Sequence, residues 1–293
     1  MSATLGKSTG PEATSKGYSI FDGTMVDMTY VQIEQAAREK AIVLFPVGVI
    51  EEHGPHLPLG VDVYGSYLIA KMLNAELKKK RIQSLIAPPF YWGMNNGTAS
   101  FPGSFTVREE TMVNLILDIM TSLRRWGFEK VFIFNHHYDE PHTRALKAAI
   151  QKARLDTGIR AYWILDDFLA KRFGFTGKES YLLICKGFPT ALSKFVEIHA
   201  DSYETSFMME YFPGLVDREV LKSLKSTDLT VQDLMNWRRG WDEARKITPQ
   251  GFFGDPTLAS PERGKELIEA FAKRGADLIE QFLQGRYQPP EMK

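Results

Sequence analysis

Short apolar runs alternate with longer segments of helical periodicity along most of the chain. The apolar runs, which predict buried strands, are residues 42–47, 84–88, 130–134 and 159–165. Apolar residues that recur every three or four positions predict helices at residues 28–40, 63–80, 109–127, 141–154, 203–212, 230–246 and 261–284. This alternation predicts a single-domain α/β fold of three layers, in which a mostly parallel sheet carries helices on both faces.

No break in composition marks a domain boundary, so we expect residues 18–293 to form one domain. Residues 1–17 are small and polar, and they predict a flexible N-terminal arm. The pattern weakens between residues 166 and 195, which suggests a lid-like or irregular insertion. Residues 91–105 form a turn-rich loop with several aromatic side chains, and a connector of this length is often functional.

Composition and charge narrow the class of protein. The 36 basic and 36 acidic residues of the 293-residue chain cancel, which argues against a nucleic-acid partner or an anionic membrane surface. No segment reaches the roughly 18 apolar residues of a membrane helix, and no apolar secretion signal is seen. The single cysteine, Cys185, fits a reducing compartment. We therefore expect a cytoplasmic protein.

The histidines point to candidate chemistry. All six lie in small clusters that include or border carboxylates: His53 with His56, then His136, His137 and His142, then His199. The first two clusters follow predicted strands, and the carboxyl ends of parallel strands meet at one edge of a sheet. Imidazole with carboxylate suits Zn²⁺ or Mn²⁺, although a single histidine is more often structural. The pattern indicates a candidate divalent-metal site.

Two acids have open roles at this stage. Asp62 precedes the predicted helix 63–80, and capping that helix is the better interpretation, with a carboxylate that bridges two metals as the alternative. Glu204 shares a helical face with Ala200 and Met208, so we expect it to point inward, whereas Glu210 is expected to be solvated.

Several motifs together resemble the creatininase (creatinine amidohydrolase) family. The most specific is residues 46–59, PVGVIEEHGPHLPL, with Asp62 at the family's spacing after it. Residues 101–104 (FPGS), 135–140 (NHHYDE) and 199–206 (HADSYETS) resemble three further motifs in the family's order. The resemblance spans roughly residues 25–220.

The resemblance implies a creatininase-like fold with two divalent ions per subunit, zinc or manganese, and a homo-oligomer that is often a hexamer. By position, it implies the metal ligands Glu51, His53, Asp62 and His137, with Asp62 as the bridge. The fifth ligand stays open between two acids. Asp139 takes the place of a metal-binding glutamate in one branch of the family, and Glu204 matches the ligand of other branches. By the same comparison His56 is structural.

The remaining site residues are also carried over from the resemblance. His199 matches a histidine that carries protons, and His199 and Asp139 are the predicted catalytic residues. The predicted substrate-binding residues are Tyr138, Asn95, Asp166 and Phe195. Asp166 and Phe195 stand where the creatinine enzyme has two tryptophans that enclose the ring. This departure argues against creatinine and favours a more hydroxylated small molecule.

These features predict a metal-dependent hydrolase in which metal-activated water attacks a carbonyl of a small, polar, cyclic substrate. Cleavage of a C–N bond, as in an amidohydrolase, is the first hypothesis. The alternative is hydrolysis of a C–C bond that opens a cyclic ketone, such as a keto-inositol of the 3-dehydro-scyllo-inosose type in sugar or inositol catabolism. A non-catalytic binding protein on the same fold is a third hypothesis, which the complete set of metal ligands disfavours.

Overall fold

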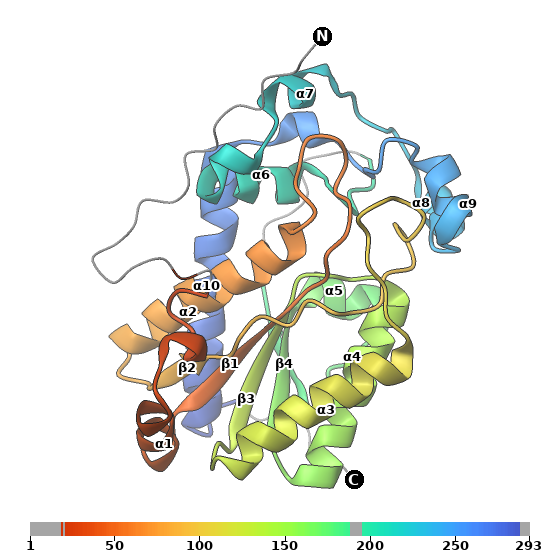
Figure 1. Cartoon of the computed structure of the whole chain (residues 1–293). Helices are drawn as coiled ribbons and strands as arrows, with labels where there is room; N and C mark the ends of the chain where they lie inside the picture. The colour runs from red at the N-terminus through yellow and green to blue at the C-terminus, as the bar shows by residue number, and fades with distance from the viewer. Residues whose placement is uncertain (1–18, 20, 188–194, 288–293) are drawn as a thin grey trace.

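The centre of the structure, a computed structural model that describes residues 19, 21–187 and 195–287, is a five-stranded sheet. The strands are β1 (Ile42–Val47), β2 (Ser84–Ile86), β3 (Lys130–Asn135), β4 (Arg160–Asp166) and β5 (Leu182–Cys185). They lie in the order β2-β1-β3-β4-β5, and every neighbouring pair is parallel (Figure 1). The predicted fold class is confirmed. The predicted arm, residues 1–17, lies outside the described residues.

Helices cover both faces of the sheet. The α-helices are α1 (Tyr30–Arg38), α2 (Val61–Lys79), α3 (Glu109–Arg125), α4 (Glu140–Thr157), α5 (Asp167–Arg172), α6 (Ser202–Tyr211), α7 (Arg218–Ser223), α8 (Val231–Trp237), α9 (Trp241–Ile247) and α10 (Pro261–Leu283). The 3-10 helices of the described residues are η1 (Met25–Asp27), η2 (Pro213–Leu215) and η3 (Pro256–Leu258). The pair α3 and α4 packs on one face, and α2, α6 and α10 pack on the other.

Alternating residues of each strand enter the two cores. In β1, Val43 and Phe45 pack with α3 and α4, whereas Ile42 and Leu44 pack with α2 and α10. Strands that are buried on both faces are continuously apolar, which is why apolar runs in the sequence predict them clearly. Within the part of the chain that is described, no helix has both the length and the apolar character needed to cross a membrane.

Two segments differ from the prediction. Residues 166–195 are not wholly irregular, because they contain α5 and β5, and β5 pairs with β4. These elements have only 6 and 4 residues, too few to show a clear periodicity. Residues 230–246 form two helices, α8 and α9, instead of one. The chain turns between them at Gly240, whose φ of 75° is not helical.

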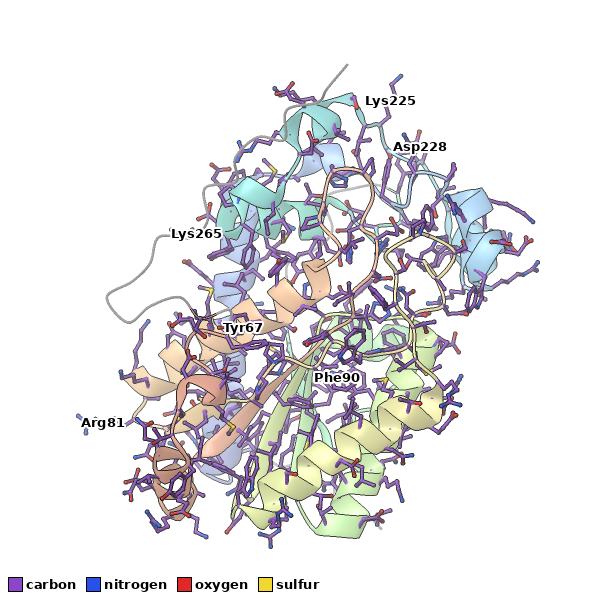
Figure 2. The ribbon with its side chains drawn as sticks, in the orientation of Figure 1. Tyr67, Arg81, Phe90, Lys225, Asp228 and Lys265 are labelled. Atoms are coloured by element: carbon purple, nitrogen blue, oxygen red, sulfur yellow. The ribbon has the colours of Figure 1, made fainter. Side chains whose placement is uncertain are left out.

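The turn after β1 brings this strand against the start of α2. A Cβ atom on Gly48 would lie 2.8 Å from the carbonyl carbon and oxygen of Asp62, so only glycine allows this approach. The other side of the turn is fixed by residue 90, since Phe90 N donates to Pro46 O and Gly48 N donates to Phe90 O. Phe90 is buried at this point, whereas the labelled Arg81 lies at the surface (Figure 2).

His56 ties the loop after β1 to α6. Its Nε2 lies 2.8 Å from the hydroxyl oxygen of Thr205, within hydrogen-bonding distance, and both side chains are buried. Burial, and then the charges of His53 and His199, lower the pKa of His56 to about 4. The imidazole is therefore neutral near pH 7, which agrees with the structural role predicted for it.

Replacing Gly48 by alanine should destabilise the protein by about 1–3 kcal/mol, because the added methyl group overlaps the backbone of Asp62. Urea denaturation of the metal-free protein measures this change. Gly214→Ala is the matched control, since a Cβ there would meet no atom within 4 Å. Equal stability of the two variants would contradict the close approach.

His56→Gln should make the stability less sensitive to acid. Between pH 6.5, the ordinary histidine pKa, and about 4, the unfolded chain takes up a proton that the folded His56 does not. The free energy of unfolding therefore decreases as the pH is lowered through this window. For this group the loss reaches about 3 kcal/mol at pH 4. Denaturation curves between pH 4 and 7 measure the effect. The same pH slope in the wild type and the variant would contradict it.

Candidate metal centre

The predicted metal-binding residues meet at the carboxyl edge of the sheet. Glu51 and His53 lie in the loop after β1, His137 is the second residue after β3, and Asp62 is in the first turn of α2. Glu204 comes from the first turn of α6, far along the chain. All five side chains are buried. Because β1 and β3 are parallel neighbours, their loops converge, as expected for this class of sheet.

Glu51, Asp62 and His137 form the first group of convergent ligands, with one ligand atom from each within 4.8 Å of the others. His137 Nδ1 lies 2.8 Å from Glu51 Oε1 and 3.1 Å from Asp62 Oδ2. Its other nitrogen, Nε2, lies 3.1 Å from the carbonyl oxygen of Met94. A hydrogen bond from Nε2 to this carbonyl orients the ring and leaves Nδ1 available as a ligand.

His53, Asp62 and Glu204 form the second group. His53 Nε2 lies 3.5 Å from Asp62 Oδ1 and 3.7 Å from Glu204 Oε2. The Nδ1 atom of His53 lies 3.1 Å from the carbonyl oxygen of Glu51, which again fixes the ring. The two carboxylate oxygens of Asp62 thus face different histidines, and Asp62 belongs to both groups. This is the geometry expected of a bridging ligand.

The structure also revises the alternative role of Asp62. The N-cap of α2 is Gly60, and no side chain caps this helix. Asp62 lies within the first turn, where its carboxylate points to the histidines instead of the free backbone N–H groups. The interpretation of Asp62 as a helix cap is therefore wrong. Glu204 is buried and points inward, as predicted.

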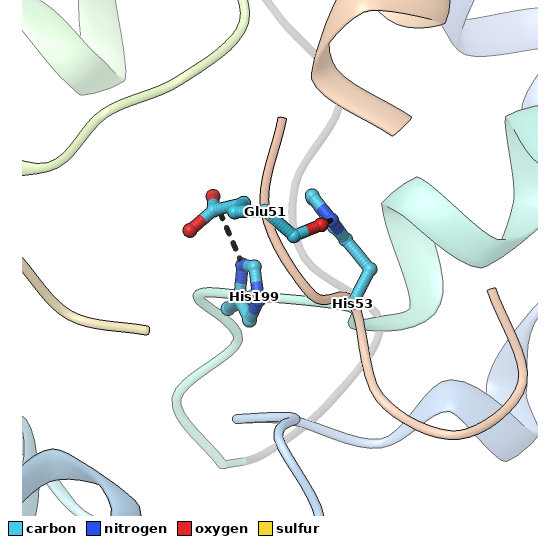
Figure 3. A group of neighbouring side chains, drawn as sticks. All are labelled: Glu51, His53 and His199. Carbon is cyan, nitrogen blue, oxygen red and sulfur yellow. Dashed lines mark hydrogen bonds and ion pairs between the residues drawn. The ribbon is translucent and has the colours of Figure 1, made fainter. Parts of the chain in front are cut away.

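His199 lies beside both groups and forms a third convergent group with Glu51 and His53. A backbone bridge to Phe253 holds it, and its Nε2 donates to the carbonyl oxygen of Glu52 at 2.7 Å. Its Nδ1 faces Glu51 Oε1 at 3.8 Å, and the rings of His199 and His53 are 4.4 Å apart (Figure 3). The next residue, Ala200, has a positive φ of 47°, a conformation that costs energy and is concentrated at functional sites.

Unpartnered polar atoms in the cluster fit a metal. His53 Nε2 and Asp62 Oδ2 are buried and have no hydrogen-bond partner among the described residues. A buried polar atom without a partner costs about 1–3 kcal/mol, which a bound cation would offset. The donor set of carboxylate oxygens and imidazole nitrogens is one that suits zinc or manganese.

The electrostatics of the cluster favour positive charge. Burial by itself would raise the pKa of Glu51, but His137 and His199 hold it below its ordinary value. Burial disfavours the charged form of His137, yet Glu51 and Asp62 raise its pKa well above the ordinary value. The pKa of Asp62 is held well below its usual range, against burial, by the neighbouring imidazoles of His136, His137 and His53. A divalent cation would take the place of these imidazolium protons.

Asp139 does not join either group. Its Oδ2 accepts hydrogen bonds from the backbone N–H groups of Asn96 and Gly97, which turns it toward the loop 91–105. Burial raises its pKa. Between the two candidates for the fifth ligand, the geometry therefore favours Glu204 over Asp139. The shorter side chain of Asp139 is engaged in holding a loop.

Asn95 lies behind the centre instead of facing the cavity described below. It is buried, and its Oδ1 accepts hydrogen bonds from the backbone N–H and the hydroxyl of Thr98. The Thr98 hydroxyl also contacts Glu51 Oε2. These contacts make Asn95 a support of Glu51, and the predicted contact of Asn95 with substrate stays a prediction.

A cavity of about 790 Å³ opens from the cluster. Its lining includes Tyr138, Asp166 and Phe195, three of the predicted substrate-binding residues. The carboxylate of Asp166 caps α5 through the N–H of Leu169, and burial raises its pKa. The hydroxyl of Tyr138 donates to the carbonyl oxygen of Asn135. The cavity places these residues around the space in front of the metal ligands.

One residue of the centre was not assigned a role from the sequence. His136 Nδ1 lies 3.3 Å from Asp62 Oδ1, and its ring stacks on Tyr203. A Cβ on Gly65 would lie 2.6 Å from this ring, so α2 carries a glycine where His136 approaches. The sequence does contain a sign of this role, because His136 stands where the related family motif has glycine.

Comparison with known proteins identifies the family. The model of the family described as "Creatininase: Creatinine amidohydrolase" matches residues 26–279. The chain is 27% identical over 285 residues to 3-dehydro-scyllo-inosose hydrolase of Thermotoga maritima, covering 90% of this chain and 86% of that protein. It is 25% identical over 276 residues to creatinine amidohydrolase of Pseudomonas putida, covering 89% and 96%.

A third kind of relative and the solved structures complete the comparison. Mycofactocin precursor peptide peptidase of Mycobacterium ulcerans is 26% identical over 230 residues, covering 77% of this chain and 79% of that protein. A crystal structure of creatinine amidohydrolase superimposes with a TM-score of 0.65 at 20% identity, covering 92% of this chain and 99% of that one. The chain belongs to the creatininase family and is a hydrolase of that family.

Proposed function

We propose that the chain is a two-metal hydrolase in which Glu51, Asp62 and His137 hold one divalent ion and His53, Asp62 and Glu204 hold the other. The observation that carries this proposal is the position of Asp62 in both groups of convergent ligands. Related structures described as "Creatininase Mn" and as a variant of "Zn-Zn type" support manganese or zinc as the ions. Bound ions of this kind supply Lewis acidity and lower the pKa of water toward neutrality.

The chain's own residues supply position and proton transfer. Hydrogen bonds from the rings to the carbonyl oxygens of Met94 and Glu51 orient His137 and His53, so the ligands are fixed before substrate binds. His199 is the proton carrier in this proposal. Its Nε2 is held by the carbonyl of Glu52 and its Nδ1 faces the ligands, which suits it to pass a proton to the leaving group.

The substrate in this proposal is a small, polar, cyclic molecule, and the bond that is hydrolysed joins its carbonyl carbon to nitrogen. The first support is the related creatinine amidohydrolase. The second candidate, opening of a cyclic ketone by C–C hydrolysis, is supported by the relative described as 3-dehydro-scyllo-inosose hydrolase. Release of ammonia or an amine marks the first reaction, whereas a new carboxylate without a nitrogen product marks the second.

Family membership and the complete ligand set favour an enzyme over the non-catalytic binding protein considered above. A structure of a creatininase variant complexed with creatine supports a small molecule as the partner. The homo-oligomer, with a hexamer as its expected form, and the cytoplasmic location stay predictions.

Asp62→Asn should weaken the binding of both ions, because one carboxylate serves both groups. We expect about 100-fold weaker binding or more, since even changes outside the ligand shell cost 10- to 100-fold. His53→Ala should remove one ion only. Metal analysis of the purified protein after dialysis measures both results.

The control for this experiment is Glu140→Gln, which removes an exposed carboxylate next to Asp139 and should keep both ions. A wild-type protein that binds fewer than two ions would contradict the two-metal centre. An Asp62→Asn protein that keeps one ion at wild-type affinity would contradict the bridging role.

His199→Ala should lower kcat by about 10²- to 10⁴-fold, the usual contribution of a positioned acid or base, while both ions stay bound. Turnover and metal content are measured on the same sample. His199 also forms a metal-capable group with Glu51 and His53. Loss of an ion together with activity would therefore make His199 a ligand and contradict its role as proton carrier.

A further inference from the structure

Two arginines from separate helices line the cavity in front of the metal centre. Arg172 is the last residue of α5, and Arg238 is the C-cap residue of α8. Burial, and then the positive charge of Arg238, lower the pKa of Arg172 to about 10. Two guanidinium groups with the same charge therefore line one cavity and lie partly out of water, an arrangement that costs free energy unless negative charge offsets it.

Within the part of the chain that the structure describes, neither guanidinium has an ion-pair partner. Arg172 Nε is buried without a hydrogen-bond partner, and this side chain contacts the ring of Phe173. The side-chain hydrogen bond that Arg238 makes to the described residues is a weak one, to Met235 Sδ at 3.9 Å. The segment 188–194, FPTALSK, contains no Asp or Glu that could add a negative charge.

Two carboxylates of the cavity wall, those of Asp166 and Asp201, cap helices. Asp166 Oδ1 accepts the N–H of Leu169. Asp201 Oδ1 accepts the N–H groups of Tyr203 and Glu204. The negative charges of both acids act on Arg172 and oppose the lowering of its pKa, although no ion pair joins either acid to it. Both guanidinium groups therefore line the cavity without an ion pair to these acids.

Tyr138 connects the arginine pair with the metal centre. It directly follows the ligand His137, and its ring stacks on Phe173 with 6.0 Å between centroids. The lining of the cavity includes both arginines and the proposed metal ligands Glu51, Asp62 and His137. A molecule in this cavity can thus contact the arginines at one end and the metal ligands at the other.

A purely structural role explains these arginines less well. A basic residue at the C-terminus of a helix is favourable, by about 0.3–1 kcal/mol at an exposed site. That gain does not require two such groups to line one cavity. Arginine is the side chain that binds carboxylate and phosphate with two parallel hydrogen bonds.

We propose that the substrate is an anion, and that Arg172 and Arg238 bind its carboxylate or phosphate group while the carbonyl to be cleaved lies at the metal centre. This rests on the proposed function for the cleavage step only. The anion site itself stands on the two arginines and the cavity. It places the substrate in a different class from the uncharged cyclic molecules considered so far.

The experiment measures anion binding without turnover. Inorganic phosphate and succinate are titrated separately into the metal-loaded protein by calorimetry, and the stronger of the two identifies phosphate or carboxylate as the preferred group. Arg172→Gln and Arg238→Gln should each weaken binding about tenfold or more, the loss expected for one charge-assisted contact. Arg239→Gln is the matched control, because this exposed neighbour does not line the cavity and should bind as the wild type does.

The metal centre is separated from the arginines by repeating the titration on Asp62→Asn. Arginine-dependent binding that persists in this variant supports the anion site, whatever becomes of the hydrolase activity. Affinity that depends on the metals but is unchanged in both arginine variants places the anion on the metals, and overturns the anion site while the proposed function stands. If Arg172→Gln fails to fold, the Arg238→Gln variant tests the proposal by itself, because Arg238 is only half-buried. Wild-type anion affinity in Arg238→Gln would overturn the proposal.

Discussion

The position of one carboxylate, that of Asp62, determines how the rest of the site is built. Each of its oxygens faces a different histidine, so the first turn of α2 must lie between the ends of β1 and β3. That approach requires glycine at residue 48, where a side chain would overlap the backbone of Asp62. It also requires glycine at residue 65, where His136 packs against α2. The backbone of α2 is therefore fitted to the metal centre on two sides.

The parallel sheet explains why ligands distant in the chain meet. The register pairs Val47 of β1 with Asn135 of β3, so the loops that carry Glu51 and His137 leave the sheet side by side. Glu204 is added from α6, which packs on α10 and on α2 over the same end. The hydrogen bond between His56 and Thr205 ties the first of these loops to α6 next to Glu204. Stability of the fold and geometry of the centre are thus maintained by the same contacts.

Most of the fold could be predicted from the sequence because its strands are buried on both faces and continuously apolar. The prediction failed where tertiary packing, and not periodicity, decides the structure. The edge strand β5 has only 4 residues and is recognised by its pairing with β4. Asp62 could be placed near the start of a helix, but its rotation toward the histidines depends on the approach at Gly48, which no local pattern encodes. The choice between Asp139 and Glu204 likewise depended on the backbone N–H groups of residues 96 and 97, which hold Asp139.

The two parts of the site differ in how the sequence encodes them. The metal ligands follow apolar strands at short, fixed distances, so their chemistry is visible as a motif. The cavity wall comes instead from α5, α6 and α8, short elements that are brought together only by folding. The wall contributes charged side chains, and the effect of each charge depends on the groups that folding places next to it. Arg172 and Arg238 are unremarkable 66 positions apart in the chain, and they become informative once one cavity contains both without a counter-ion from the described residues. Substrate class is therefore the property that the sequence encodes least directly, and the paired arginines of the cavity wall are the feature that indicates it.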